Sequence, residues 1–143
     1  MAKMFIKDER RLLLLIAREA ITSLINTGSV PSREVKSEKL HAMFGCFVTI
    51  KMGGKLRGCI GNFISDKPLF KLVQEMATAA ATRDPRFYPM KKLDLDNFTL
   101  EISVLSPLQK ISSIDEIQVG THGIYMERNV HRGVLLPQVA SEQ

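Results

Sequence analysis

The stretch Cys46-Phe47-Val48-Thr49-Ile50-Lys51-Met52-Gly53-Gly54-Lys55-Leu56-Arg57-Gly58-Cys59-Ile60 decides the fold of this chain. Two segments rich in apolar residues flank Gly53-Gly54, a dipeptide typical of the tight two-residue turn of a β-hairpin. We therefore predict an antiparallel hairpin with strands over 46–52 and 55–60. The glycine inside the second strand, Gly58, indicates that a backbone or a ligand approaches closely there.

The position of the turn predicts which residues lie opposite one another. The predicted pairs are Leu56 with Lys51, Arg57 with Ile50, Gly58 with Thr49 and Cys59 with Val48. Because side chains alternate between the faces of a strand, Arg57 and Cys59 would share one face, and Cys46 would lie on that face too. Both faces also carry apolar residues, so we expect the hairpin to be central in its sheet and covered on both sides.

Two helices are predicted around the hairpin. Apolar residues recur at helical spacing over Asp8–Asn26, and Gly28 is a suitable stop. Asp66, with Pro68 in the first turn, opens a second helix that ends near Arg83.

Further antiparallel strands are predicted towards the end of the chain. Apolar and polar residues alternate over Asn97–Ser106, which indicates a half-buried strand. A second hairpin is predicted over Ile124–Leu136, where a turn at Asn129-Val130 would pair Arg132 with Glu127. Valine is poorly suited to a positive φ, so a longer loop stays an alternative.

The fold class predicted from these elements is α+β, a mainly antiparallel sheet with flanking helices. Residues 27–43 are mostly polar and are interpreted as a small N-terminal flap or subdomain with a short helix. A chain of 143 residues with 45% apolar content can bury one core without disulfides or metals. We therefore expect residues 1–143 to form a single domain.

Composition argues against several classes of protein. The net charge of +5, from 20 basic and 15 acidic residues, is less basic than a dedicated nucleic-acid-binding arm would be. The apolar run Leu12 to Ala17 is far shorter than the about 20 residues that span a bilayer, so no membrane role is expected. Two cysteines and no secretory leader indicate a reducing, cytoplasmic setting.

The segment Leu56-Arg57-Gly58-Cys59-Ile60-Gly61 resembles the hexapeptide motif of the AMMECR domain family. Four further blocks stand in the family's order at about its spacing: Arg83-Asp84-Pro85-Arg86-Phe87, Glu101-Ile102-Ser103-Val104-Leu105-Ser106, His122-Gly123-Ile124, and Arg132-Gly133 with Leu135-Leu136-Pro137-Gln138-Val139-Ala140. The resemblance covers nearly the whole chain. Family domains continue past the last block with a tryptophan-bearing segment and a further helix, so a chain that ends at Gln143 without tryptophan is expected to be a C-terminally short member.

Residues and resemblance together single out a candidate site. Cys59 and His122 are the catalytic candidates, because a cysteine nucleophile needs a base or a cation to hold it as thiolate. The ligand-binding candidates are Arg57, Gly58, Gly61, Arg83, Asp84, Arg86, Glu101 and Arg132. Two cysteines and one well-placed histidine fall short of a four-ligand zinc site, so no metal is expected, and the sequence assigns no cofactor.

Each candidate also has a purely structural interpretation. Cys59 is either a small buried core residue or a reactive thiol. Arg83, Asp84 and Arg86 follow a predicted helix end, where such charges commonly form ion pairs on a solvated turn. An arginine that points into a covered face needs a partner, and Glu101 is the predicted partner of Arg57.

Two functional hypotheses remain open at this point. In the first, a cleft lined by the hexapeptide binds and modifies an anionic small molecule or a macromolecule. In the second, the same groove binds a protein or peptide without catalysis. The resemblance implies partners as well, since relatives occur with a Memo-type protein and a radical S-adenosylmethionine enzyme, a system in which this chain is similar to protein A. Nucleic acid is the least supported ligand, because no aromatic stacking platform is evident.

Overall fold

The computed structural model describes residues 5–106 and the backbone of two strands over 124–128 and 131–135. The chain divides into two compact units, residues 1–108 and 109–143. The first unit contains α1 (Lys7–Thr27), a 3-10 turn η1 (Glu38–His41), β1 (Gly45–Met52), β2 (Lys55–Asn62), α2 (Leu69–Thr82), a 3-10 turn η2 (Lys92–Asp96) and β3 (Phe98–Leu105). The second contains β4 (Ile124–Arg128) and β5 (His131–Leu135).

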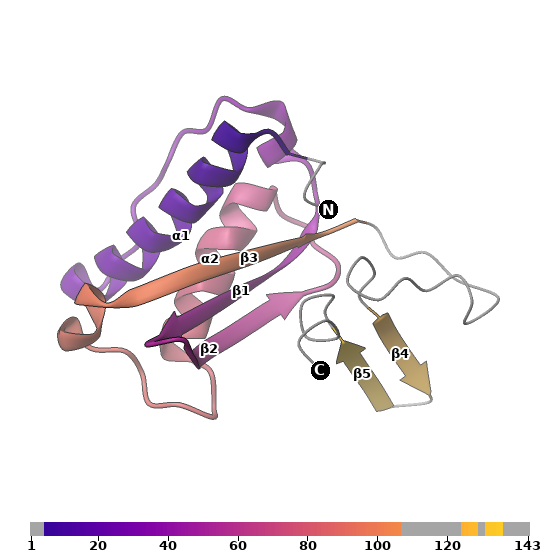
Figure 1. The fold of residues 1–143 in the computed structure, drawn as a ribbon. Helices are drawn as coiled ribbons and strands as arrows, with labels where there is room; N and C mark the ends of the chain where they lie inside the picture. Colours follow the sequence, from indigo (N-terminus) through magenta and orange to yellow (C-terminus); the bar gives the residue numbers. More distant parts are fainter. Residues whose placement is uncertain (1–4, 107–123, 129–130, 136–143) are drawn as a thin grey trace. The chain divides into compact units, whose positions relative to one another are not determined.

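The first unit is a three-stranded antiparallel sheet with both helices on one face (Figure 1). The strand order is β2-β1-β3, so β1 is central and β2 lies at an edge of the sheet that residues 5–106 form. The predicted α+β class with a mainly antiparallel sheet is confirmed. The expectation that the first hairpin is central holds for β1, and among residues 5–106 β2 has β1 as its one strand neighbour.

The core lies between the sheet and the two helices. From β1 it receives Cys46, Val48 and Ile50, all fully buried. The helices contribute the following buried residues: Leu13, Ile16, Ala17 and Ile21 from α1, and Leu69, Leu72, Val73, Met76, Ala77 and Ala80 from α2. Within residues 27–43, Val35 and Leu40 are buried in the same core.

The helix boundaries follow the sequence signals closely. Gly28 ends α1 in the left-handed conformation, with φ of 82°, and its N–H donates to the carbonyl of Leu24 at 2.8 Å. The second helix begins at Leu69, with Pro68 as its N-cap. Neither helix is long and apolar enough to cross a membrane, within the residues that the structure describes.

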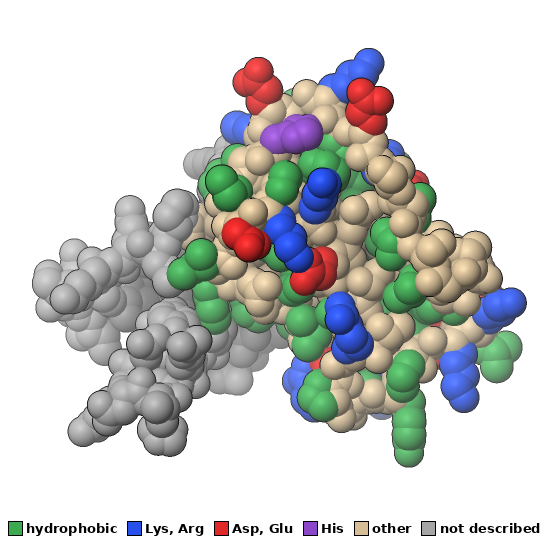
Figure 2. All heavy atoms as spheres, turned by 180° about the vertical axis from the view of Figure 1, so that it is seen from behind, with side chains coloured by type: hydrophobic (Ala, Val, Ile, Leu, Met, Phe, Trp, Pro, Cys, Tyr) green, Lys and Arg blue, Asp and Glu red, His purple; other side chains and the backbone are tan. Residues whose placement is uncertain are grey.

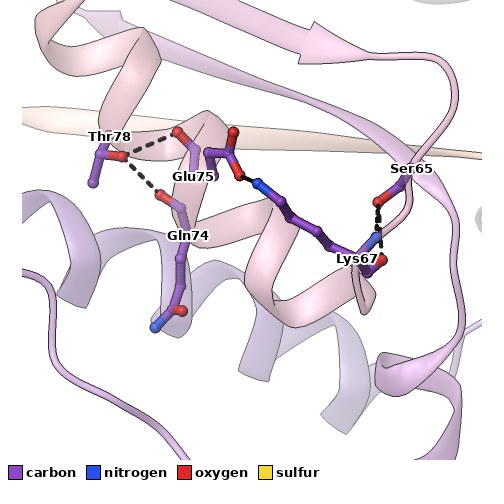
Figure 3. A network of polar contacts seen from close by, with 5 residues as sticks. All are labelled: Ser65, Lys67, Gln74, Glu75 and Thr78. Carbon is purple, nitrogen blue, oxygen red and sulfur yellow. Dashed lines mark hydrogen bonds and ion pairs between the residues drawn. The ribbon is translucent and has the colours of Figure 1, made fainter.

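Polar contacts fix the first turns of α2 (Figure 3). Lys67, just before the helix, pairs with Glu75, and its backbone N–H donates to the hydroxyl of Ser65 at 2.9 Å. Further along, the Thr78 hydroxyl donates to the carbonyls of Gln74 and Glu75, both at 3.0 Å.

The register of the first hairpin differs from the prediction because β2 contains a β-bulge. Gly53 and Gly54 form the turn as predicted, with φ of 58° and 77°, and Lys51 pairs with Leu56. Beyond that point Ile50 pairs with Gly58 rather than with Arg57, so Arg57 is the extra residue.

The bulge reverses the predicted faces of the remaining strand, because a shift of one residue moves every side chain to the other side. The predicted pairs of Arg57, Gly58 and Cys59 were therefore wrong, and so was the shared face of Cys59 and Cys46. Cys46 belongs to the core between sheet and helices, whereas Cys59 pairs with Thr49 on the opposite face.

The second hairpin has the register that the sequence predicted. Glu127 pairs with Arg132 and Arg128 with His131, which leaves residues 129 and 130 to connect the strands.

Gly58 is the point of closest approach between β2 and α2. A Cβ atom built on Gly58 would lie 2.1 Å from the carbonyl oxygen of Ala80, in the last turns of the helix. The predicted close approach at this glycine is confirmed, although the neighbour is a helix backbone rather than a group opposite Thr49.

We expect the substitution Gly58→Ala to destabilise the fold by about 1–3 kcal/mol, the scale of overpacking a well-packed interior. The added methyl group can be accommodated only if α2 moves away from the sheet. Urea unfolding followed by circular dichroism measures the loss, with Lys55→Ala, an exposed position of the same strand, as the matched control. Equal unfolding midpoints for the two variants would contradict the close-approach argument.

Candidate functional site

Cys59 lies on the sheet face that points away from the helices. Its Sγ is 3.2 Å from the hydroxyl of Thr49, its partner on the central strand. Glu101 of β3 is paired with Thr49 from the other side, so Cys59, Thr49 and Glu101 form a row across the three strands. Cys59 is half-buried.

Asp84, in the loop after α2, fixes the backbone of this cysteine. Its Oδ2 accepts a hydrogen bond from the Cys59 N–H at 3.0 Å. The same carboxylate accepts three hydrogen bonds from Arg86: from the backbone N–H at 3.1 Å, from Nε at 3.0 Å and from Nη2 at 2.7 Å. The Asp84 side chain is only 2% exposed, so the expected solvated ion pair is instead a buried carboxylate that joins two sequence blocks.

The Arg86 guanidinium, followed by the N–H groups of Cys59 and Arg86, holds the pKa of Asp84 well below its usual range. The carboxylate is therefore ionised at neutral pH and cannot act as a general acid. The pKa of Arg86 is raised in turn, chiefly by Asp84, and the Cys59 sulfur adds a smaller electrostatic contribution. Arg86 and the Cys59 N–H thus donate to the same carboxylate, that of Asp84.

Arg57 is directed towards the loop that follows α2. Its Nη2 donates to the carbonyl of Tyr88 at 2.7 Å and lies 3.9 Å from Oδ2 of Asp94. The guanidinium carbon is 5.9 Å from the ring centre of Phe87, within the range of a cation–π contact. Its other terminal nitrogen, Nη1, is buried and finds no hydrogen-bond partner within the described part of the chain.

Glu101 is not the partner of Arg57, which corrects the prediction. Its carboxylate is exposed and lies 3.5 Å from the ammonium of Lys51. Glu101 pairs with Thr49 on the face away from the helices, whereas Arg57 reaches the loop after α2. The carboxylate near Arg57 belongs to Asp94 in η2.

The other predicted site residues fall into two groups. Gly61 lies beneath the ring of Phe47, since a Cβ there would be 2.3 Å from the ring, and Arg83 is an exposed residue that ends α2. His122 and the side chain of Arg132 lie outside the described residues. Within the described part of the chain, no group of three or more histidine, cysteine and acidic side chains is placed to hold a metal ion.

Comparison with known proteins agrees with this architecture. The family model described as AMMECR1 matches residues 14–143. The chain belongs to the AMMECR1 family. A relative from Methanothermobacter thermautotrophicus is 42% identical over 143 residues, which cover 95% of this chain and 74% of that protein. One from Methanosarcina mazei is 34% identical over 148 residues, with 97% and 74% coverage.

A solved structure of this AMMECR1 fold supports the architecture. The crystal structure of the uncharacterised protein PH0010 from Pyrococcus horikoshii matches with a TM-score of 0.88 and 33% sequence identity. The match covers 94% of this chain and 72% of PH0010.

Three contacts of the AMMECR1 site were missed by reasoning from sequence: Thr49 at the thiol, and Tyr88 and Asp94 at Arg57. Thr49 could have been found only with the correct register. Tyr88 contacts Arg57 through its backbone carbonyl, and no pattern of side chains in a sequence predicts a backbone contact of this kind. Asp94 lies 37 positions after Arg57 in the chain, and nothing in its own neighbourhood indicates the contact.

We expect Asp84→Asn to destabilise the protein by about 1–3 kcal/mol at neutral pH, because an amide cannot accept all the hydrogen bonds that the carboxylate receives. A group whose pKa is lowered on folding stabilises the fold above its unfolded pKa of about 3.9 and loses that effect as the pH falls. The difference in unfolding free energy between Asp84→Asn and wild type should therefore become smaller as the pH falls from about 5 to about 2.

Unfolding free energies measured at several pH values test this, with Asp66→Asn, an exposed carboxylate, as the control. A difference that stays constant down to the lowest pH would show that Asp84 is not held ionised by folding.

Proposed function

We propose that this protein binds an anionic ligand at Leu56–Gly61, with Arg57 and Arg86 as the cationic groups and the Cys59 thiol as the reactive side chain beside the ligand. The observation that carries the proposal is the Nη1 of Arg57, which is buried and has no hydrogen-bond partner among the residues that the structure describes. A buried donor without an acceptor costs about 1–3 kcal/mol, so an oxygen atom of a ligand would stabilise the site by completing it.

The charges around the site support an anion rather than a cation. The charge of Asp84 is neutralised by Arg86. Among the described residues, the one carboxylate paired with Arg57 is that of Asp94, whose Oδ2 lies 3.9 Å from Nη2. The Arg86 side chain is 54% exposed, so its outer edge is open to a ligand. A guanidinium suits a carboxylate or a phosphate because its donors form a planar fork.

A catalytic role assigns Cys59 as the nucleophile and His122 as the base that supports it. Thr49 supports this role as a positioning residue, because its hydroxyl contacts the sulfur and fixes the side chain. Involvement of a Memo-type protein and a radical S-adenosylmethionine enzyme belongs to the same proposal and rests on the family resemblance.

The alternative is a binding module that breaks no bond, and one observation favours it. Among residues 5–106, the hydrogen-bond partner of the Cys59 sulfur is a hydroxyl, not an imidazole or a carboxylate base. Nucleic acid is supported least. On the face seen in Figure 2, basic side chains alternate with acidic and apolar ones, unlike the continuous basic stripe typical of nucleic-acid-binding surfaces.

Alkylation of Cys59 by a charged and a neutral reagent tests the proposal. A site that attracts anions should raise the rate with iodoacetate relative to iodoacetamide in the folded protein, compared with the same ratio in urea. We expect an increase of about fivefold, which corresponds to about 1 kcal/mol of attraction. Cys46 should stay unmodified in the folded protein, because burial raises the pKa of its thiol to about 12.

Variants that remove single arginines show which guanidinium raises the rate ratio. Arg86→Gln and Arg57→Gln should each lower the ratio, whereas Arg83→Gln, an exposed arginine of the same loop, should leave it unchanged. A folded-state ratio equal to the ratio in urea would refute the anion site. A thiol that reacts only on unfolding would remove the catalytic role.

A further inference from the structure

Three large apolar side chains are exposed in the segments that Arg57 connects. Leu56 is 41% exposed, Tyr88 88% and Leu93 89%. They come from three segments, namely the start of β2, the loop after α2, and η2. Isolated exposed apolar residues are common, but a group of them beside a cation is typical of binding surfaces.

Arg57 is what brings the three segments together. It follows Leu56 in the chain, donates to the backbone carbonyl of Tyr88 at 2.7 Å, and lies 3.9 Å from Asp94, the neighbour of Leu93. The loop after α2 passes close to the turn of the β1–β2 hairpin before it reaches η2 (Figure 1).

Leu93 lies on the turn η2, which is stabilised by two hydrogen bonds between Lys91 and Asp94. The N–H of Asp94 donates to the carbonyl of Lys91 at 2.8 Å, and the Asp94 carboxylate accepts the N–H of Lys91 at 2.8 Å. None of the five residues of η2 is buried. Two hydrogen bonds and the half-buried Leu95, which packs against the core, therefore hold the turn while Leu93 stays exposed, which suits a surface that contacts a partner.

The charges that surround these side chains indicate the chemistry of that partner. Exposed basic residues dominate the segments 55–57 and 83–96: Lys55, Arg83, Arg86, Lys91 and Lys92, against the exposed acidic residue Asp96. A partner should therefore be acidic. A second copy of this chain, docked symmetrically through the same surface, would bring like charges together.

We propose that Leu56, Tyr88 and Leu93 form, with Arg57, a docking surface for an acidic and apolar polypeptide segment of a partner protein. The apolar side chains of the segment cover Tyr88 and Leu93, and one of its carboxylate or main-chain oxygens accepts the hydrogen bond from Arg57 Nη1. This inference rests on the proposed function, since it names a polypeptide as the carrier of the anionic group that Arg57 binds.

Selection from a random twelve-residue peptide library, against the full chain, tests this surface directly and requires no identified partner. The selected peptides should combine acidic with large apolar residues. Labelled versions of them should bind at least tenfold more weakly to the double variant Tyr88→Ser/Leu93→Ser, as measured by fluorescence anisotropy. Ile64→Ser, which replaces a side chain that is 73% exposed elsewhere on the unit, is the matched control and should bind as wild type does.

Several results would contradict the docking surface. No enriched peptide, basic peptides, or peptides that bind the double variant equally well would each overturn the docking surface. So would self-association of the wild-type chain that the double variant abolishes in light scattering, because the occupant would then be a second copy. Unfolding midpoints of the variants, expected to equal that of wild type, exclude loss of folding as the cause.

The alkylation ratio at Cys59 separates this inference from the proposed function. If the double variant keeps the preference for iodoacetate while no peptide is selected, the docking surface is wrong and the anion site stands. If Arg57→Gln changes neither the alkylation ratio nor peptide binding, the assignment of Arg57 fails in both proposals.

Discussion

The contact between Gly58 of β2 and the carbonyl of Ala80 in α2 is the constraint on which the rest of the site depends. A strand backbone and a helix backbone can approach this closely only where the strand residue has no Cβ atom. A Cβ built on Gly58 would lie only 2.1 Å from the carbonyl oxygen of Ala80. Gly58 must therefore face the helix, and the bulge at Arg57 gives it that orientation. With a regular register the arginine would take a helix-facing place opposite Ile50, where its charge would be buried against the core.

The same approach explains why Asp84 reaches Cys59. Because the end of α2 is held against β2, the residue that follows the helix by two positions lies beside the next residue of the strand. Its carboxylate accepts the outward N–H of Cys59, as the carbonyl of a neighbouring strand would, and Arg86 compensates the buried charge. The positive charge of Arg86 is thereby held near the thiol by structure that serves the fold.

Local sequence patterns predicted those features of the fold that depend on the conformational preferences of neighbouring residues. Gly53-Gly54 indicated the hairpin turn and Gly28 the end of α1, because positive φ angles restrict the choice of residue. The bulge was not predictable, since it is imposed by a helix that packs on the strand from a distant part of the chain. The error of one residue then produced the wrong face for Cys59. The partner of Arg57 was wrong for another reason, because the carboxylate near it comes from η2, far along the chain. The family motif singled out the segment Leu56–Gly61 but carries no information on which side each residue faces.

Within residues 5–106, β2 lies at the edge of its sheet, and this position limits what kind of ligand suits the site. An edge strand normally offers its free N–H and C=O groups to another strand. Here Asp84 accepts the N–H of Cys59, and the Tyr88 loop is held across the start of the strand by Arg57. A partner that adds a strand along this edge would have to displace both contacts. Recognition through side chains, by the guanidinium groups and the exposed Tyr88 and Leu93, leaves them intact and is therefore the less costly mode.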